Sequence, residues 1–351
     1  MRAVLIGLGI GVLGLALAVA LGGASSSDLL RSTLAAWLVI IAMPLGALPV
    51  VMALDLAGIG ATPGTAPLRL LLAALPAAAV LGVLSVGLAA VSPSHLHLAA
   101  LYGSSSSGSG DFAARWFAPA WLGARTIVYL VIWVALALVF LVPASQPSAR
   151  RSKIAAWGLA LHLVVGTLAA IDWTMSLDLG PKASAFGLLL ISLQCAFALT
   201  LALLMTAVGS GRRSLRVPSL MTLVAVAAAT FMQFEQYLVV WSANLPREIV
   251  WYQHRLAGLG ATMFIAAPFI LIVAAVVLMP VGLSSRRWPV VVATALLLLL
   301  EVADLLWLVT PAWRASFVVS VLDLSALVGL AGLIGAGALF VTHRTKEARH
   351  G

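Results

Sequence analysis

Long apolar runs separated by short polar connections dominate this chain. A run of about 20 apolar residues can cross the hydrocarbon of a bilayer as an α-helix. The sequence contains ten such runs, at 3–22, 34–54, 69–90, 121–142, 154–174, 184–208, 217–241, 257–279, 288–309 and 317–341. The pattern therefore predicts an all-α integral membrane protein with about ten transmembrane helices.

The composition points to the same fold class. Hydrophobic residues make up 63% of the 351 positions and charged residues 9%, and the mean hydropathy is +1.13. A soluble core of this length could not bury so much apolar surface. Because most connections are short, we expect residues 1–351 to form a single membrane domain that packs as helix bundles.

The net charge of +9 follows membrane topology, so we do not expect nucleic acid as a partner. With the N-terminus taken as cytoplasmic, 13 of the 20 basic residues fall on inner segments, in agreement with the positive-inside rule. The other seven fall on outer segments and are Arg31, Arg115, Arg125, Lys182, Arg247, Arg255 and Arg314. Both termini are predicted to be cytoplasmic.

No pattern in the sequence predicts a metal or a covalently bound cofactor. There is no CxxCH motif for a c-type haem, and Cys195 is the only cysteine. His95 and His97 alternate in a way that could ligate a metal, but no third ligand is evident nearby. We therefore expect a solvated loop there and no metal site.

Acidic residues recur at a similar depth in several predicted spans. Counting about 1.5 Å per residue from each helix start places five of them in the outer half of the membrane. They are Asp172, Glu235, Glu301, Asp304 and Asp323. Each carboxylate in hydrocarbon costs roughly 2.5–3.5 kcal/mol on insertion scales, so each needs a partner or water. We interpret them as the lining of a hydrated half-channel for protons that opens outward.

Glu301 and Asp304 have two competing interpretations. Glu301 and Asp304 are three residues apart and share a helix face, so their charges repel if both ionise. They are either a proton-holding pair or interfacial acids bridged to Arg314 or Arg255.

Arg125, with Tyr129 one turn later, either snorkels to the interface or pairs with a buried carboxylate.

His162 lies about three turns before Asp172 on the same predicted span. A b-type haem would need a second histidine at a comparable depth, and none is present. His162 is then a hydrogen-bonded bundle residue or a proton relay. His162 and Asp172 could also contribute to a quinone pocket, although a packed polar cluster without ligand is the favoured alternative.

Three stretches together resemble one family. They are WFAPAWLGARTIVYLVIW at Trp116–Trp133, AAIDWTMSLD at Ala169–Asp178 and YLVVWSANLPREIVWYQHR at Tyr237–Arg255. They are similar to the second quinone-binding-type membrane subunit (ActF) of alternative complex III, a quinol:cytochrome c oxidoreductase. That subunit is related to the NrfD and polysulfide-reductase membrane subunits.

The resemblance implies two four-helix bundles flanked by one helix at each end of the chain. In these terms 1–33 is the first helix with its outer loop, 34–174 the first bundle, 184–309 the second bundle, and 317–351 the last helix with a cytoplasmic tail. The resemblance also suggests a proton path. Motif positions that could serve it are Arg125, Tyr129, Asp172, Ser176, Asp178, Glu235, Tyr237 and Trp241.

The implied partners are a related quinol-site membrane subunit, a multihaem cytochrome c, an iron–sulfur protein, small membrane subunits and a terminal oxidase. Haem and iron–sulfur centres would sit on those partners, quinone would bind in the complex, and lipids would surround this chain. The expected function is that of a scaffold and proton-conducting subunit in a bacterial inner membrane, not catalytic alone. A proton-coupled secondary transporter and a purely structural membrane anchor are the alternatives.

Overall fold

The computed structural model describes residues 1–22, 26–60, 63–91, 115–143, 148–177, 185–209, 215–281 and 287–350. His95, His97 and Asp178 lie outside the described residues. The helices are α1 (Arg2–Gly22), α2 (Ser26–Leu56), α3 (Ala66–Leu72), α4 (Leu75–Val91), α7 (Pro119–Leu141), α8 (Ala149–Trp173), α9 (Phe186–Val208), α10 (Arg216–Ala243), α11 (Pro246–Leu256), α12 (Leu259–Val281), α13 (Trp288–Val309) and α14 (Val321–His350).

The predicted fold class is confirmed. Within the described residues, nine helical segments are long and apolar enough to cross a membrane, and α12 occupies the one remaining predicted span, at 257–279. The chain is therefore a multi-pass membrane protein. The predicted span at 69–90 is broken at Ala73 and Ala74 into α3 and α4. The short helix α11, which begins with Pro246, was not predicted.

The contacts between the central helices arrange them in two rings of four. In the first bundle, α2 packs on α4, α4 on α7, α7 on α8, and α8 on α2. In the second, α9 packs on α10, α10 on α12, α12 on α13, and α13 on α9. The bundles join mainly through α2 and α9. These two helices approach so closely at Gly46 that an added Cβ would lie 1.8 Å from the carbonyl oxygen of Gln194.

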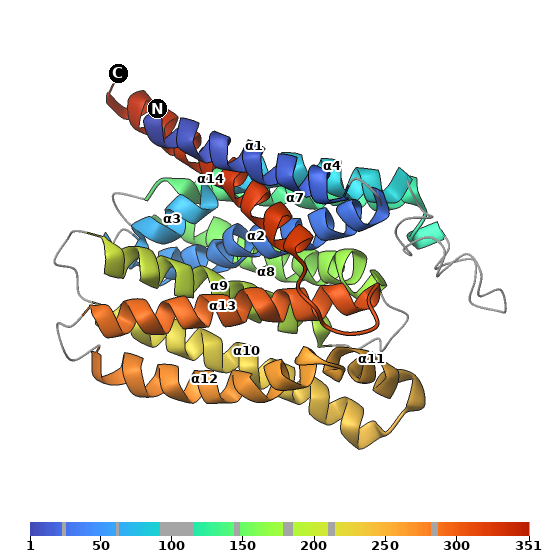
Figure 1. The fold of residues 1–351 in the computed structure, drawn as a ribbon. Helices are drawn as coiled ribbons and strands as arrows, with labels where there is room; N and C mark the ends of the chain where they lie inside the picture. Colours follow the sequence, from blue (N-terminus) through green and yellow to red (C-terminus); the bar gives the residue numbers. More distant parts are fainter. Residues whose placement is uncertain are drawn as a thin grey trace.

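The first and last helices lie side by side along the bundles (Figure 1). Small residues permit this antiparallel contact, because a Cβ added at Gly14 would lie 2.6 Å from Cα of Gly329. Close approach of helix backbones at small residues is typical of membrane interfaces. Both termini consequently lie at one end of the molecule, which we call the terminal end, and the opposite end is the distal end.

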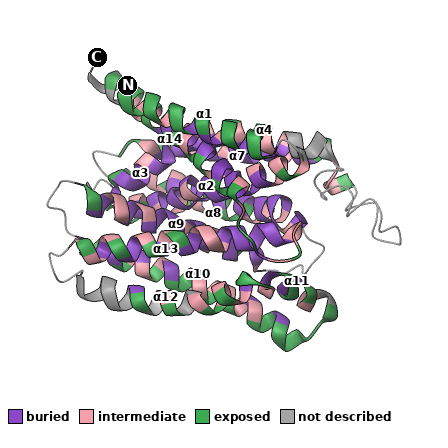
Figure 2. Cartoon of the chain, in the orientation of Figure 1, coloured by how far each residue is buried: buried purple, intermediate pink, exposed green. Residues whose placement is uncertain are grey.

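Burial follows the bundle axes (Figure 2). Trp37, Trp133 and Phe140 of the first bundle are at most 1% exposed. Large apolar side chains such as Leu5, Phe269 and Leu299 project outward and are more than 60% exposed. An apolar exterior around a packed interior suits hydrocarbon as the surrounding solvent, since lipid imposes no cost on exposed Leu or Phe.

Candidate functional site

Charged and polar side chains gather in four places in the described structure, and one of these is the distal end of the first bundle. Asp172 at the end of α8 has a fully buried side chain. Nε and Nη2 of Arg125 donate to its oxygens at 2.8 and 3.0 Å, and Tyr129 and Trp116 each donate at 3.0 Å. We call these four residues the distal cluster.

The distal cluster is a complete ion pair. Each Asp172 oxygen accepts two hydrogen bonds, and Nη1 of Arg125 donates to the Trp116 carbonyl at 2.7 Å. The guanidinium also stacks 4.1 Å from the centre of the Trp116 ring. Four donated hydrogen bonds and one opposite charge satisfy this buried carboxylate, so the pair is suited to holding α7 and α8 together. Of the two interpretations of Arg125, pairing with a buried carboxylate is confirmed.

His162 is buried in the middle of the first bundle, 2% exposed. Among the described residues, neither of its ring nitrogens has a hydrogen-bond partner, and the indole nitrogen of Trp133 also has none. The two rings lie 6.0 Å apart. No described residue forms a hydrogen bond with the ring of His162, so the prediction that it is a hydrogen-bonded bundle residue is wrong. His162 is also ten residues from Asp172 on α8, about 15 Å along the helix, so these two do not form one pocket.

The terminal end of the first bundle has a second ion cluster. Asp55 of α2 accepts from Nη2 of Arg69 at 2.7 Å and from Nε of Arg151 at 2.7 Å. Arg69 also donates to the carbonyls of Gly60 and Phe140. This terminal cluster joins α2, α3, α7 and α8, as the distal cluster joins α7 and α8 at the other end. The sequence did not predict that Arg69 and Arg151 pair with Asp55, because they are 14 and 96 residues away from it in the chain.

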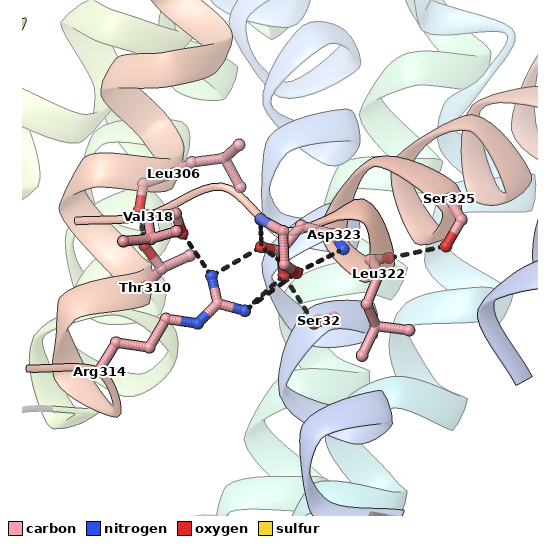
Figure 3. A network of polar contacts seen from close by, with 9 residues as sticks. Ser32, Leu306, Thr310, Arg314, Val318, Leu322, Asp323 and Ser325 are labelled. Carbon is pink, nitrogen blue, oxygen red and sulfur yellow. Dashed lines mark hydrogen bonds and ion pairs between the residues drawn. The ribbon is translucent and has the colours of Figure 1, made fainter. Parts of the chain in front are cut away.

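Asp323 lies in the first turn of α14, and each of its carboxylate oxygens accepts hydrogen bonds from neighbouring side chains (Figure 3). It accepts from Nη1 and Nη2 of Arg314 at 2.7 and 2.9 Å and from the Ser32 hydroxyl of α2 at 2.6 Å. The Asp323 carboxylate also accepts from the Ser320 amide at 2.8 Å, while Ser320 Oγ accepts from the Asp323 amide at 3.2 Å. This reciprocal pair is a capping box. The capping box fixes the start of α14. Asp323 therefore has a structural role and does not line a channel with the other four acids.

The second bundle contains two carboxyl groups that face a different environment. Glu301 of α13 is 4% exposed, and its Oε1 lies 2.8 Å from the hydroxyl of Thr200 on α9. Its other oxygen is buried and has no hydrogen-bond partner among the residues that the structure describes. Asp304, one turn along α13, is half-buried and lies 3.4 Å from the side-chain amide of Gln233 on α10.

No lysine or arginine in the described part of the chain forms an ion pair with Glu301 or Asp304. The alternative of bridging to Arg314 or Arg255 is thus wrong. Arg314 is engaged by Asp323, and the Arg255 guanidinium donates to the carbonyls of Trp251 and Leu308. We call Glu301 and Asp304 the carboxyl pair. It differs from Asp55, Asp172 and Asp323, all of which have arginine partners.

Glu235 and Tyr237 lie near the distal end of α10, where the chain turns at Asn244 into α11. Asn244 adopts the left-handed conformation with φ 50° and ends α10. Tyr237 lines a groove of about 580 Å³ between α10 and α11, and its ring packs against Tyr252 at 5.3 Å. Burial is the main factor that raises the pKa of Tyr252, Arg255 opposes it, and Tyr237 and Glu235 add to it. Tyr252 therefore stays a neutral hydrogen-bond donor.

The five acids expected to line one channel are thus distributed over three places. Asp172 belongs to the first bundle, Asp323 to the junction of α14 with α2, and Glu235, Glu301 and Asp304 to the second bundle. Thr200, which the sequence did not mark, belongs with the last group. Thr200 stands in an apolar run of α9 and is 101 residues from Glu301 in the sequence. The residues around Thr200 therefore do not indicate that it contacts an acid.

Comparison with known proteins adds no assignment, since no protein-family model and no curated protein matches this sequence.

Proposed function

We propose that this chain is a membrane subunit of a quinol-oxidising electron-transfer complex, resembling the ActF-type subunit of alternative complex III. In this proposal it supplies a scaffold and a proton path and has no redox centre of its own. Its partners are a related quinol-site membrane subunit, a multihaem cytochrome c, an iron–sulfur protein, small membrane subunits and a terminal oxidase. Haem and iron–sulfur centres belong to those partners.

Two features support the assignment to such a complex. The chain has two four-helix bundles with one further helix at each end of the sequence, as the resemblance implies. Two of the three motif stretches meet in space, because Arg125, Tyr129 and Trp116 from one contact Asp172 from the other. The distribution of basic residues supports a bacterial inner-membrane location with the terminal end, and so both termini, in the cytoplasm.

The carboxyl pair is the observation that carries the proton path. A carboxylate at the centre of a span costs about 2.5–3.5 kcal/mol, and Asp55, Asp172 and Asp323 offset this cost with arginines. Within the described part of the chain, the polar side chains that contact Glu301 and Asp304 are one hydroxyl and one amide. Glu301 and Asp304 are most stable when they hold protons, and groups that hold protons inside a bundle can pass them on. The proposed path also includes Glu235, which lies closer to the distal end on α10.

The proposal is tested in two steps. Purification in mild detergent should bring haem and iron–sulfur proteins along with this chain, whereas recovery of a lone chain would refute the assignment to the complex. In vesicles reconstituted with the complex, Glu301→Gln should lower the number of protons released per quinol oxidised without impairing assembly. The matched control Asp28→Asn changes an exposed acid on α2 and should leave proton release unchanged. An unchanged stoichiometry in Glu301→Gln would exclude the proton role.

A proton-coupled secondary transporter is the second candidate. The uncompensated carboxyl pair and the break between α3 and α4 favour it, since transporters use buried acids and interrupted helices. The two bundles, however, begin with helices that run in the same direction, because three described spans, an odd number, lie between α2 and α9. Transport of a substrate by the purified chain alone would select this function. A purely structural anchor predicts instead that no carboxyl substitution alters proton coupling.

A further inference from the structure

We propose that the carboxyl pair, together with Thr200 and Gln233, is a binding site for one monovalent alkali cation, held in exchange with a proton. The inference rests on the ion-handling role proposed for the pair and does not depend on the electron-transfer partners. It concerns a site inside the second bundle, where α9, α10 and α13 each contribute side chains.

The unpartnered oxygen of Glu301 is the first reason. Its Oε2 is buried and accepts no hydrogen bond from the described residues, and a buried acceptor without a donor costs about 1–3 kcal/mol. The corresponding oxygens of Asp172 and Asp323 accept two or more hydrogen bonds each. A cation or a proton at Glu301 would remove this cost, whereas an apolar environment cannot.

The hydroxyl of Thr200 is the second reason. It lies 2.9 Å from the Ala196 carbonyl and 2.8 Å from Glu301 Oε1, but it has only one proton to donate. If the proton goes to the carbonyl, as is common for threonine in helices, a lone pair of Thr200 faces Glu301. That oxygen can then accept from a protonated Glu301 or coordinate a cation next to an ionised Glu301.

The remaining donors are also oxygens or can present one. The contact of 3.4 Å between Gln233 and Asp304 is long for a hydrogen bond to a carboxylate. Turning the Gln233 amide by half a rotation would place its carbonyl oxygen toward Asp304. Carboxylate, hydroxyl and amide oxygens are the ligands of hard cations.

Charge balance selects a monovalent ion. The pair is neutral when both carboxyls are protonated. Binding of one alkali cation with loss of one proton leaves one cation, one proton and two carboxylates, so the site is neutral again. A divalent ion would also balance two carboxylates, but the cost of transferring an ion into a low-dielectric interior grows with the square of its charge. Mg²⁺ in addition gives up its waters reluctantly.

The helices around the carboxyl pair carry few other titratable residues that could take part in the exchange with protons. Cys195 lies on α9, Glu235 and Tyr237 lie on α10, and α12 carries no titratable residue. Glu235 is the one acid among these residues. Arg255 on α11 donates to the Leu308 carbonyl one turn beyond Asp304 and opposes cation binding.

The test is equilibrium binding of radioactive sodium to the purified protein, with choline chloride keeping the ionic strength constant. We expect saturable binding of one Na⁺ per chain. The concentration for half-saturation should rise about tenfold for each pH unit lowered, because one proton is exchanged. Glu301→Gln and Asp304→Asn should each weaken binding about tenfold or more, whereas the exposed control Asp28→Asn should bind like the wild type.

A second measurement needs no substitution. A hydrophobic carbodiimide reacts with protonated buried carboxyls, and Na⁺ should slow its reaction at Glu301 several-fold relative to choline. Absence of saturable Na⁺ binding, binding independent of pH, or equal labelling in Na⁺ and choline would each overturn the cation site. Those outcomes leave a proton-only pair, which the proton stoichiometry of Glu301→Gln tests separately. The two proposals can thus fail independently.

Discussion

Replacing Asp172 by Asn should lower the free energy of unfolding of the protein by about 3–5 kcal/mol, because breaking a buried ion pair leaves an uncompensated charge. Asn has nearly the shape of Asp, so no cavity forms and the loss is electrostatic. The carboxylate accepts four hydrogen bonds, two of them from Arg125. Since a hydrogen bond to a charged group contributes about 1.5–3 kcal/mol, Tyr129→Phe should cost about half as much as Asp172→Asn.

A double-mutant cycle isolates the pair. Arg125→Gln alone should also destabilise by several kcal/mol, but the double variant Arg125→Gln with Asp172→Asn should cost about 2 kcal/mol less than the sum, because neither charge is then left alone. Unfolding in mild detergent can be followed by tryptophan fluorescence, since Trp133 and Trp173 lie in the first bundle. Additive effects within about 0.5 kcal/mol, or a loss below about 1 kcal/mol for Asp172→Asn, would refute the assignment of the distal cluster as a structural clamp.

Two further substitutions test the packing and the polar interior. Gly14→Ala should destabilise the protein by about 1–3 kcal/mol, since its Cβ meets the backbone of Gly329. Gly9→Ala is the matched control with no atom within 4 Å of the added Cβ, and equal thermal stability of the two variants would contradict the close contact of α1 and α14. His162→Phe should change stability by less than about 1 kcal/mol, because no described residue bonds its ring nitrogens. A loss of more than about 2 kcal/mol in thermal unfolding would show that these nitrogens are hydrogen-bonded in the protein.

The spans were predictable because each is a local property. A helix at 288–309 was expected from its apolar run and was found at Trp288–Val309, since lipid forces every backbone group in a span to bond within its own helix. The break at Ala73 and Ala74 was not predicted. The span contains Pro76 just beyond the break, but proline alone does not specify whether a membrane helix kinks or divides.

The site was predictable only in part. Arg125, Tyr129 and Asp172 were identified from the sequence as ionisable or polar residues in spans, and one pairing among the alternatives for Arg125 was right. Whether an acid is neutralised depends on residues far away in the chain. Asp323 contacts Ser32, 291 residues away in the sequence, and Glu301 contacts Thr200, 101 residues away. No local sequence pattern therefore distinguishes Asp323, which has an arginine partner, from Glu301, which has none among the described residues.

The sequence by itself determined that this chain crosses a membrane many times and that its buried acids need neutralisation, because both follow from the transfer of side chains out of water. Only the tertiary structure decided which acids have an arginine and which do not. Helix packing brings α7 to α8 and places Arg314 beside Asp323, yet leaves α13 facing a threonine and a glutamine. Pairing in space depends on how the helices rotate against one another, and that rotation is set by contacts between residues far apart in the sequence.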